Sequence, residues 1–144
     1  MMKLVLDANE LFSAVITRGR EHSSWALEAL FSEKVELYAP YRLLAELEKH
    51  GEEIKSKSGF SSRDFDAFIA VLAMRVRFTP LDEFRREIPE ALKLAPHPKD
   101  AEYFALALKL GCGILSEEKA FKRQPKVEIL NAKELLEKIS KKAP

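Results

Sequence analysis

Short apolar runs alternate along this chain with longer segments in which apolar residues recur every three or four positions. The short runs predict β-strands at residues 4–6, 35–39, 76–79, 113–115 and 127–130. The longer segments predict helices at residues 11–16, 24–31, 41–57, 62–73, 84–94, 101–110 and 133–142. Because strands and helices follow one another in turn, the pattern predicts an α/β fold with a central, mostly parallel sheet of about five strands and helices on both faces.

Proline and glycine mark several of these boundaries. Gly111 is expected to end the helix at residues 101–110, and Gly59 to lie in the turn between two helices. Pro89 falls within the predicted helix at residues 84–94, where it is tolerated if it occupies a first turn.

Length and composition indicate one globular domain, residues 1–144, with the last few residues frayed. The hydrophobic fraction of 47% is ordinary for a folded protein and excludes a disordered chain. Cys112 is the single cysteine, which excludes a disulfide framework and a Cys-rich zinc site; we interpret it as buried and inert. Abundant Lys and Glu beside one Gln and two Asn hint at a heat-adapted source, a thermophile.

The formal net charge is only +1, although 33% of residues are charged. Any contact with nucleic acid must therefore come from local basic patches rather than from a globally basic surface. The sequence contains no signal peptide and no apolar run of membrane-spanning length, so we expect a cytoplasmic protein with no membrane partner.

Four acidic residues fall at one edge of the predicted sheet. Asp7 directly follows the first strand, and Glu118 follows the strand at residues 113–115. Glu46 lies early in the helix after the second strand, and Asp100 heads the helix that leads into the fourth. Ligands of parallel sheets gather outside the carboxyl ends of the strands. Clustered carboxylates repel one another unless a cation lies between them, and oxygen-only ligands favour Mg²⁺ or Mn²⁺ over zinc.

Each of these acids, taken singly, also has a simpler structural explanation. Asp7 is suited to cap the helix that follows it, and Glu46 to face solvent on its helix. Asp100 and Glu118 lie at helix starts, where the helix dipole favours negative charge. Only their common position at one sheet edge favours a functional site. Histidine spacing, glycine content and the absence of a nucleophile elbow or P-loop point to no competing chemistry.

Four sequence blocks resemble the PIN domain family. They are Val-Leu-Asp-Ala-Asn at residues 5–9, Leu-Leu-Ala-Glu at 43–46, the block 98–108 that contains Asp-Ala-Glu-Tyr-Phe, and Ile-Leu-Ser-Glu-Glu-Lys-Ala-Phe at 114–121. The order and spacing of the blocks cover nearly the whole chain. The resemblance implies a three-layer α/β/α sandwich. It also implies a metal-dependent ribonuclease, similar to the toxins of prokaryotic toxin–antitoxin pairs, to archaeal-type stand-alone PIN proteins and to RNA-processing enzymes.

By that resemblance Asp7, Glu46, Asp100 and Glu118 are the metal-binding and catalytic positions, holding Mg²⁺ or Mn²⁺ for hydrolysis of RNA phosphodiester bonds. Asn9 and Ser116 are expected to orient the carboxylates or the phosphate. The residues that we expect to contact RNA are all basic: Arg18, Arg20, Arg42, Lys119, Lys122 and Arg123.

The chain departs from the family pattern close to the expected site. Glu118 replaces the usual Asp, Ala8 replaces a common Ser or Thr, and Ala120 stands where some members carry a further acid. Glu10 occurs where an apolar residue is frequent, so it either adds charge to the pocket or faces solvent. These departures leave an alternative function open: a catalytically weakened PIN-like module that acts as an RNA- or protein-binding scaffold.

Two protein partners are consistent with this resemblance. A toxin would bind an antitoxin peptide or protein through an apolar groove, for which the segments at residues 60–68 and 25–31 are candidates, although core packing also explains their aromatic residues. Chains of this fold commonly pair, so we also expect a homodimer.

Overall fold

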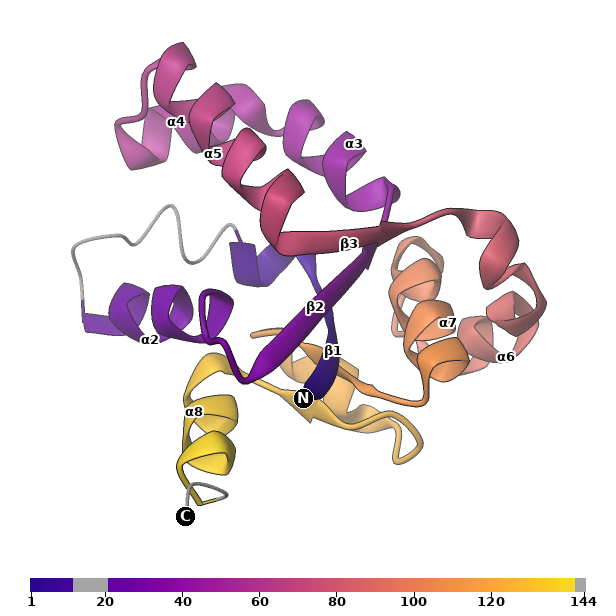
Figure 1. Cartoon of the computed structure of the whole chain (residues 1–144). Helices are drawn as coiled ribbons and strands as arrows, with labels where there is room; N and C mark the ends of the chain where they lie inside the picture. Colours follow the sequence, from indigo (N-terminus) through magenta and orange to yellow (C-terminus); the bar gives the residue numbers. More distant parts are fainter. Residues whose placement is uncertain (12–20, 142–144) are drawn as a thin grey trace.

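The computed structural model describes residues 1–11 and 21–141. Its centre is a five-stranded sheet in the order β3-β2-β1-β4-β5, and every neighbouring pair is parallel. The strands are β1 (Met2–Leu6), β2 (Val35–Pro40), β3 (Val76–Thr79), β4 (Gly113–Leu115) and β5 (Ile129–Leu130). Figure 1 shows helices on both sides of this sheet, which confirms the predicted α/β/α sandwich.

The helices after the first strand are α2 (Glu21–Leu30), α3 (Arg42–Lys49), α4 (Gly51–Ser58), α5 (Ser62–Arg75), α6 (Ile88–Leu94), α7 (Ala101–Leu110) and α8 (Ala132–Lys141). Short 3₁₀ turns are η1 (Leu81–Glu83), η2 (Arg85–Glu87), η3 (Pro98–Asp100) and η4 (Lys119–Arg123). The apolar α7 packs on β1, β2 and β4 and is covered by α6, whereas α2 packs against α8 on the other side of the sheet (Figure 1). No helix in the described part of the chain is long and apolar enough to cross a membrane.

One segment that the sequence predicts as a single helix is broken into two. The segment at residues 41–57 forms two helices, α3 and α4, which meet at His50 with φ −99° and ψ 12°, outside the helical region. Gly51 follows this bend, and glycine has a poor helix propensity. The bend keeps Leu47 of α3 and Ile54 of α4 both buried in the core. The segment at residues 84–94 is also shorter as an α-helix than expected, since α6 begins at Ile88 with Pro89 in its first turn.

Two glycines shape the turn that leads from α7 into β4. Gly111 ends α7 with a left-handed φ of 65°, as predicted, and the Cys112 backbone N–H donates to the Ala107 carbonyl at 3.1 Å. A Cβ on Gly113 would lie 2.6 Å from the Glu128 carbonyl oxygen, so only glycine fits between these strands. Cys112 itself is half-buried rather than buried, and this burial raises the pKa of its thiol to about 11, which keeps it protonated at neutral pH.

Strand register sets Asp7 beside Ser116. Leu6 pairs with Leu115 across β1 and β4, and the Asp7 backbone N–H continues this ladder by donating to the Leu115 carbonyl at 3.1 Å. The Ser116 backbone N–H donates in turn to the Leu130 carbonyl at 2.9 Å. Both side chains therefore emerge at the carboxyl edge of the sheet, where the sequence predicts a site.

Candidate functional site

Asp7 is the buried centre of the acidic edge. Its side chain is 3% exposed, and its Oδ2 atom accepts a 2.7 Å hydrogen bond from the hydroxyl of Ser116. Burial raises the pKa of Asp7 to about 7, opposed by the Ser116 hydrogen bond and reinforced by the negative charges of Asp100 and Glu46. The buried Asp7 carboxylate is therefore costly to ionise, and a bound cation would offset that cost.

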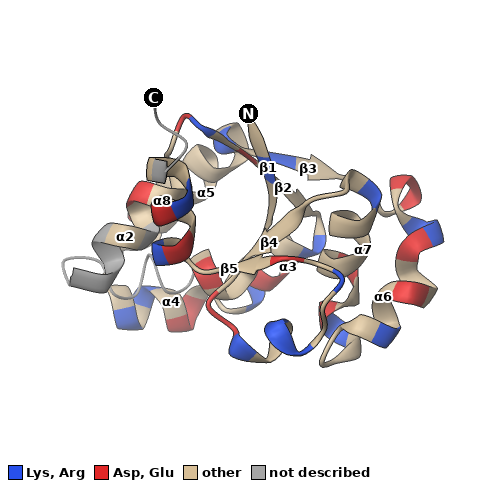
Figure 2. Ribbon diagram, turned by 90° about the horizontal axis from the view of Figure 1, so that it is seen from below, with Lys and Arg blue, Asp and Glu red and all other residues tan. Residues whose placement is uncertain are grey.

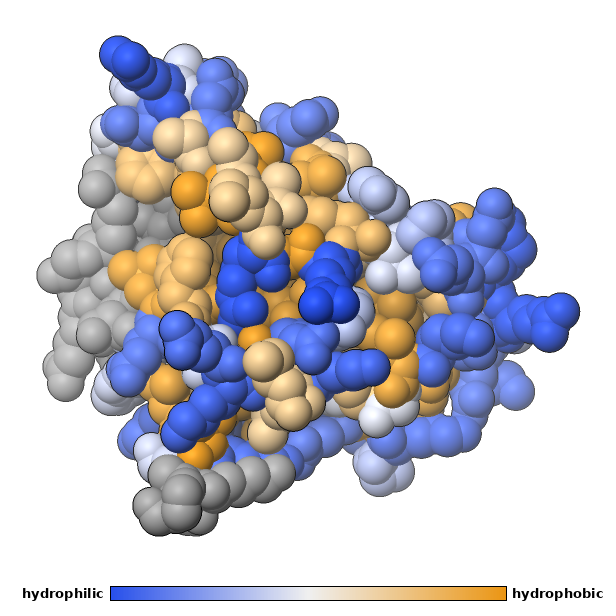
Figure 3. All heavy atoms as spheres, viewed as in Figure 1, coloured by the Kyte–Doolittle hydropathy of each residue, from blue (hydrophilic) through white to orange (hydrophobic). Residues whose placement is uncertain are grey.

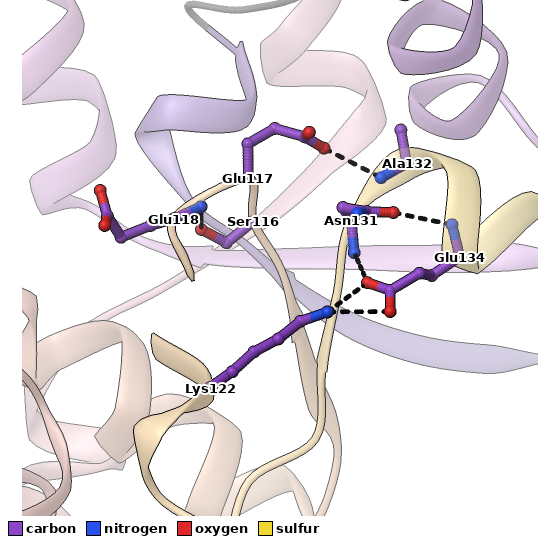
Figure 4. Close-up of polar contacts among 7 residues, drawn as sticks. All are labelled: Ser116, Glu117, Glu118, Lys122, Asn131, Ala132 and Glu134. Atoms are coloured by element: carbon purple, nitrogen blue, oxygen red, sulfur yellow. Dashed lines mark hydrogen bonds and ion pairs between the residues drawn. The ribbon is translucent and has the colours of Figure 1, made fainter. Parts of the chain in front are cut away.

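Ser116 links two of the predicted acidic positions. While its hydroxyl donates to Asp7, its oxygen accepts a 3.0 Å hydrogen bond from the backbone N–H of Glu118, as Figure 4 shows. Ser116 is 1% exposed, so solvent does not compete for these two hydrogen bonds. Ser116 thus fixes Asp7 relative to the loop that carries Glu118.

Asp100 is half-buried at the position directly before α7, and its side chain makes no capping hydrogen bond there. The capping role one turn earlier belongs to His97, whose Nδ1 accepts from the Lys99 backbone N–H at 3.1 Å. Burial raises the pKa of Asp100; Lys99 and His97 lower it, and Glu46 and Glu118 raise it further. The carboxylate is therefore not used for capping and lies within electrostatic reach of two other predicted acids.

Glu46 has both carboxylate oxygens occupied. Its Oε1 accepts from Arg42 Nε at 2.9 Å, and its Oε2 accepts from the Tyr103 hydroxyl at 3.2 Å. Arg42 also reaches Glu102 of α7 through Nη1 at 3.3 Å, so one guanidinium joins two carboxylates. Sequence reasoning missed Tyr103 as part of this site. Its position one helical turn after Asp100 was the available signal, because residues three apart share a helix face.

Glu118 lies at the start of η4, where its Oε1 accepts from the Ala120 backbone N–H at 3.4 Å. The simpler capping explanation therefore holds for this residue in part. Its neighbour Glu117 points to the opposite side of the loop, as Figure 4 shows, and its Oε2 accepts from the Ala132 backbone N–H of α8 at 3.0 Å.

Glu10 is the most unusual acid in the structure. It is 0% exposed, and no donor reaches its ionised carboxylate oxygens, whereas the protonated carboxyl group hydrogen-bonds with Glu117. Burial raises its pKa to about 9; the hydrogen bond with Glu117 and the negative charges of Glu117 and then Asp7 raise it further. Of the two roles that its sequence position left open, a solvent-facing one is excluded, because the side chain is buried beside other acids.

The predicted RNA-contacting residues differ in their availability. Arg18 and Arg20 lie outside the described residues. Arg42 is engaged with Glu46 and Glu102. Lys122 binds both carboxylate oxygens of Glu134, at 2.7 and 2.8 Å (Figure 4).

Two cations remain available beside the acidic loop. Lys119 and Arg123 are exposed, and neither forms an ion pair within the described part of the chain. They belong to the basic turn that directly follows the acidic loop after β4 in Figure 2. Asn9, the other predicted polar neighbour, is also exposed.

The donor chemistry of this edge fits a hard divalent cation, since Asp7, Glu46, Asp100 and Glu118 offer only oxygen atoms. The electrostatic effects on Asp7 and Asp100 connect all four residues. Within residues 1–11 and 21–141, however, no group of three His, Cys, Asp or Glu side chains is arranged to hold a metal ion. Ligation of one ion would therefore require the carboxylates to close around it.

Comparisons with known proteins agree with this fold. The family model described as "PIN domain" matches residues 5–142, almost the whole chain. A crystal structure of VapBC2 from Rickettsia felis, bound to a DNA fragment from its promoter, is similar with a TM-score of 0.62 and 17% sequence identity, covering 90% of this chain and 98% of that one. No curated protein sequence matches this chain. Because the family model spans nearly every residue, the chain belongs to the PIN domain family.

Proposed function

We propose that this protein is a Mg²⁺- or Mn²⁺-dependent endoribonuclease whose site is built from Asp7, Glu46, Asp100 and Glu118. PIN domains are generally metal-dependent nucleases. The observation that carries the proposal is the mutual electrostatic effect of these four acids around a buried Asp7 at the carboxyl edge of the sheet. Such repulsion is unfavourable unless a cation offsets it.

The four acids take different roles in this proposal. Asp7 and Asp100 ligate the ion directly, because neither carboxylate is held on both oxygens. Glu46 acts through water, since Arg42 and Tyr103 occupy both of its oxygens. Glu118, on an exposed loop, closes from the side of Ser116. When bound, a divalent cation supplies an activated water and stabilises the charge that develops on the phosphate.

Other residues would orient the substrate. Ser116 holds Asp7 in place through its 2.7 Å hydrogen bond. Asn9, two residues after Asp7, is exposed. Lys119 and Arg123 are exposed cations that follow the acidic loop, so we assign them to the RNA phosphates. Neutralising either of these two is expected to weaken RNA binding and to reduce its dependence on salt.

Cleavage of single-stranded RNA tests the proposal. The wild-type protein is expected to cleave in Mn²⁺ or Mg²⁺ and to lose this activity in EDTA, while Asp7→Ala and Asp100→Ala are inactive in either ion. Glu48→Gln, on the exposed side of α3, is the matched control and retains activity. Undiminished cleavage by both Ala variants would refute the assignment.

Within this family we assign the protein to the toxin-like nucleases. The support is its resemblance in fold to the VapBC2 structure. By this assignment it works in the cytoplasm, forms a homodimer and is held inactive by an antitoxin partner. Co-expression with a small DNA-binding protein encoded beside it would test this: relief of growth inhibition supports the toxin role, and an absence of toxicity favours RNA processing.

A second candidate function is a PIN-like scaffold with a weakened site. It is favoured by the engagement of both Glu46 oxygens and by the capping bond of Glu118. The α5 helix also exposes Val71 and Met74, by 47% and 89%, and Figure 3 shows apolar surface over this part of the molecule. RNA binding without any metal-dependent cleavage would favour this function over the nuclease.

A further inference from the structure

A groove between α6 and α7 lies beside the acidic edge of the sheet. Its volume is about 410 Å³, within the range of pockets that hold small ligands. Its apolar lining comes from three segments: Leu81 of η1, Ile88 and Leu92 of α6, and Pro98 of η3. The two helices pack side by side, as Figure 1 shows. Leu92 is 48% exposed, so this apolar lining is open to solvent.

The α6–α7 groove is continuous with the proposed catalytic edge. Pro98 lines the groove two residues before Asp100. Glu102, which also lines it, accepts a 3.3 Å hydrogen bond from Nη1 of Arg42. The Nε atom of the same guanidinium donates to Glu46 at 2.9 Å. One arginine side chain therefore separates the wall of the groove from one of the four proposed catalytic acids.

Two polar side chains in the groove are suited to a nucleobase. Arg85 is 65% exposed and pairs with the exposed Asp82, and ion pairs at the surface are weak. Its planar guanidinium is therefore able to stack on an aromatic ring. Glu102 uses Oε2 for Arg42, and its Oε1 accepts no hydrogen bond from the described residues. This oxygen is available to a donor on a bound ring.

A cation for the phosphate of the same nucleotide lies at the end of the groove. Lys99, between Pro98 and Asp100, is exposed, and its positive charge acts on Asp100. Single-stranded nucleic acids bind where surfaces that stack on bases adjoin cations that contact phosphates. An apolar side chain of a protein partner would use the apolar lining but neither Lys99 nor the free oxygen of Glu102. The charges therefore favour a nucleotide as the occupant.

We propose that the α6–α7 groove binds one nucleobase of the RNA substrate, and that Glu102 selects bases that carry an amino group. This proposal rests on the proposed nuclease function and deepens it. A carboxylate only accepts hydrogen bonds, so it pairs with the amino groups of adenine, cytosine or guanine. Uracil carries a carbonyl oxygen on each side of its N–H group, and these oxygens would face the carboxylate unfavourably.

The test is nuclear magnetic resonance of the methyl groups of Leu81, Ile88 and Leu92 during titration with nucleotides in EDTA. The probes are the monophosphates of adenosine, cytidine and uridine, and ribose phosphate without a base. EDTA removes metal ions, so binding is measured separately from cleavage. The adenosine and cytidine monophosphates should shift these signals, and uridine monophosphate should bind roughly tenfold more weakly. Ribose phosphate should leave the signals unchanged.

Three variants locate the site. Leu92→Ser should lose nucleotide binding, whereas Leu27→Ser should keep it, because Leu27 is an exposed leucine of α2 on the other side of the sheet. Glu102→Gln should bring the affinities for cytidine and uridine monophosphates to within about twofold, since an amide both donates and accepts. A variant that was merely less stable would not change this ratio.

Each outcome supports or overturns the proposal. Equal binding of cytidine and uridine monophosphates by the wild type would overturn selection by Glu102, and equal shifts with ribose phosphate would overturn base recognition. If no nucleotide shifts the three methyl signals, the groove is left to a protein partner, while RNA cleavage in Mn²⁺ would still support the nuclease. Nucleotide binding in the groove of a protein that cleaves no RNA would support this site and overturn the nuclease.

Discussion

Replacing Glu10 with Gln should stabilise the protein in the absence of metal. In the folded chain the pKa of Glu10 rises from 4.5 to about 9, so between these values the folded state holds a proton that the unfolded state has lost. The contribution of Glu10 to the unfolding free energy is therefore fully present below pH 4.5 and is lost as the pH rises toward 9. Gln carries no charge at any of these pH values, so the variant does not lose this unfolding free energy as the pH rises.

The size of the effect follows from the pH. Each pH unit above 4.5 costs about 1.4 kcal/mol until the folded pKa is reached, so at pH 7 the wild type has lost about 3 kcal/mol. Glu10→Gln should recover up to about 3 kcal/mol of unfolding free energy at pH 7 and close to none at pH 4.5. For a chain of this size that corresponds to a rise of roughly 5–10 °C in Tm.

The assay is urea unfolding followed by circular dichroism, in EDTA, at pH 4.5 and pH 7. Glu48→Gln removes one exposed charge from α3 and is expected to change the unfolding free energy by no more than about 0.5 kcal/mol. A Glu10→Gln variant that is less stable than the wild type at pH 7, or that gains the same unfolding free energy at both pH values, would refute this prediction.

Three further variants probe the acidic edge. Asp7→Asn should raise the unfolding free energy in EDTA at pH 8 by about 4 kcal/mol, because burial raises the Asp7 pKa from 3.8 to about 7. Below pH 3.8 the variant should gain nothing, and thermal melts across this pH range measure the difference. Ser116→Ala should lower the unfolding free energy at pH 8 by about 1–3 kcal/mol, because it removes the hydroxyl that donates the 2.7 Å hydrogen bond to Asp7. Ser116→Thr keeps the hydroxyl and is the control; equal stability of the two variants would contradict this. Arg42→Gln should tighten Mn²⁺ binding by about threefold to tenfold in calorimetry, because it uncovers the charge of Glu46; weaker binding would show that Arg42 does not compete with the ion.

The sheet was predictable from sequence because its strands are continuous apolar runs bounded by turn residues. Residues 4–6 and 113–115 lie in buried neighbouring strands, so the positions of Asp7 and Ser116 at one edge follow from their places in the chain. Gly111 likewise identified the end of α7, since its left-handed φ is one that glycine adopts without strain. The bend at His50 was not predicted, because the apolar spacing of residues 43–54 is compatible with one continuous helix.

The parts of the site that sequence did not predict depend on contacts between distant segments. Glu10 is an ionisable residue soon after the first strand, and only the packed structure shows that it is buried beside Glu117, 107 positions along the chain. Tyr103 reads as a core aromatic residue, although its hydroxyl reaches Glu46 from 57 positions away. The pairing of Arg42 with Glu102, 60 positions along the chain, is likewise a contact that its place in the sequence does not indicate.

The most direct test of the nuclease account is calorimetric titration of Mn²⁺ into the wild type and Asp100→Asn, with single-stranded RNA cleavage measured on the same samples. Asp100 is the informative residue because its carboxylate is free of capping and is influenced by both Glu46 and Glu118. We expect Asp100→Asn to lose its bound Mn²⁺ and all metal-dependent cleavage together. Equal Mn²⁺ binding and equal cleavage by the two proteins would contradict it.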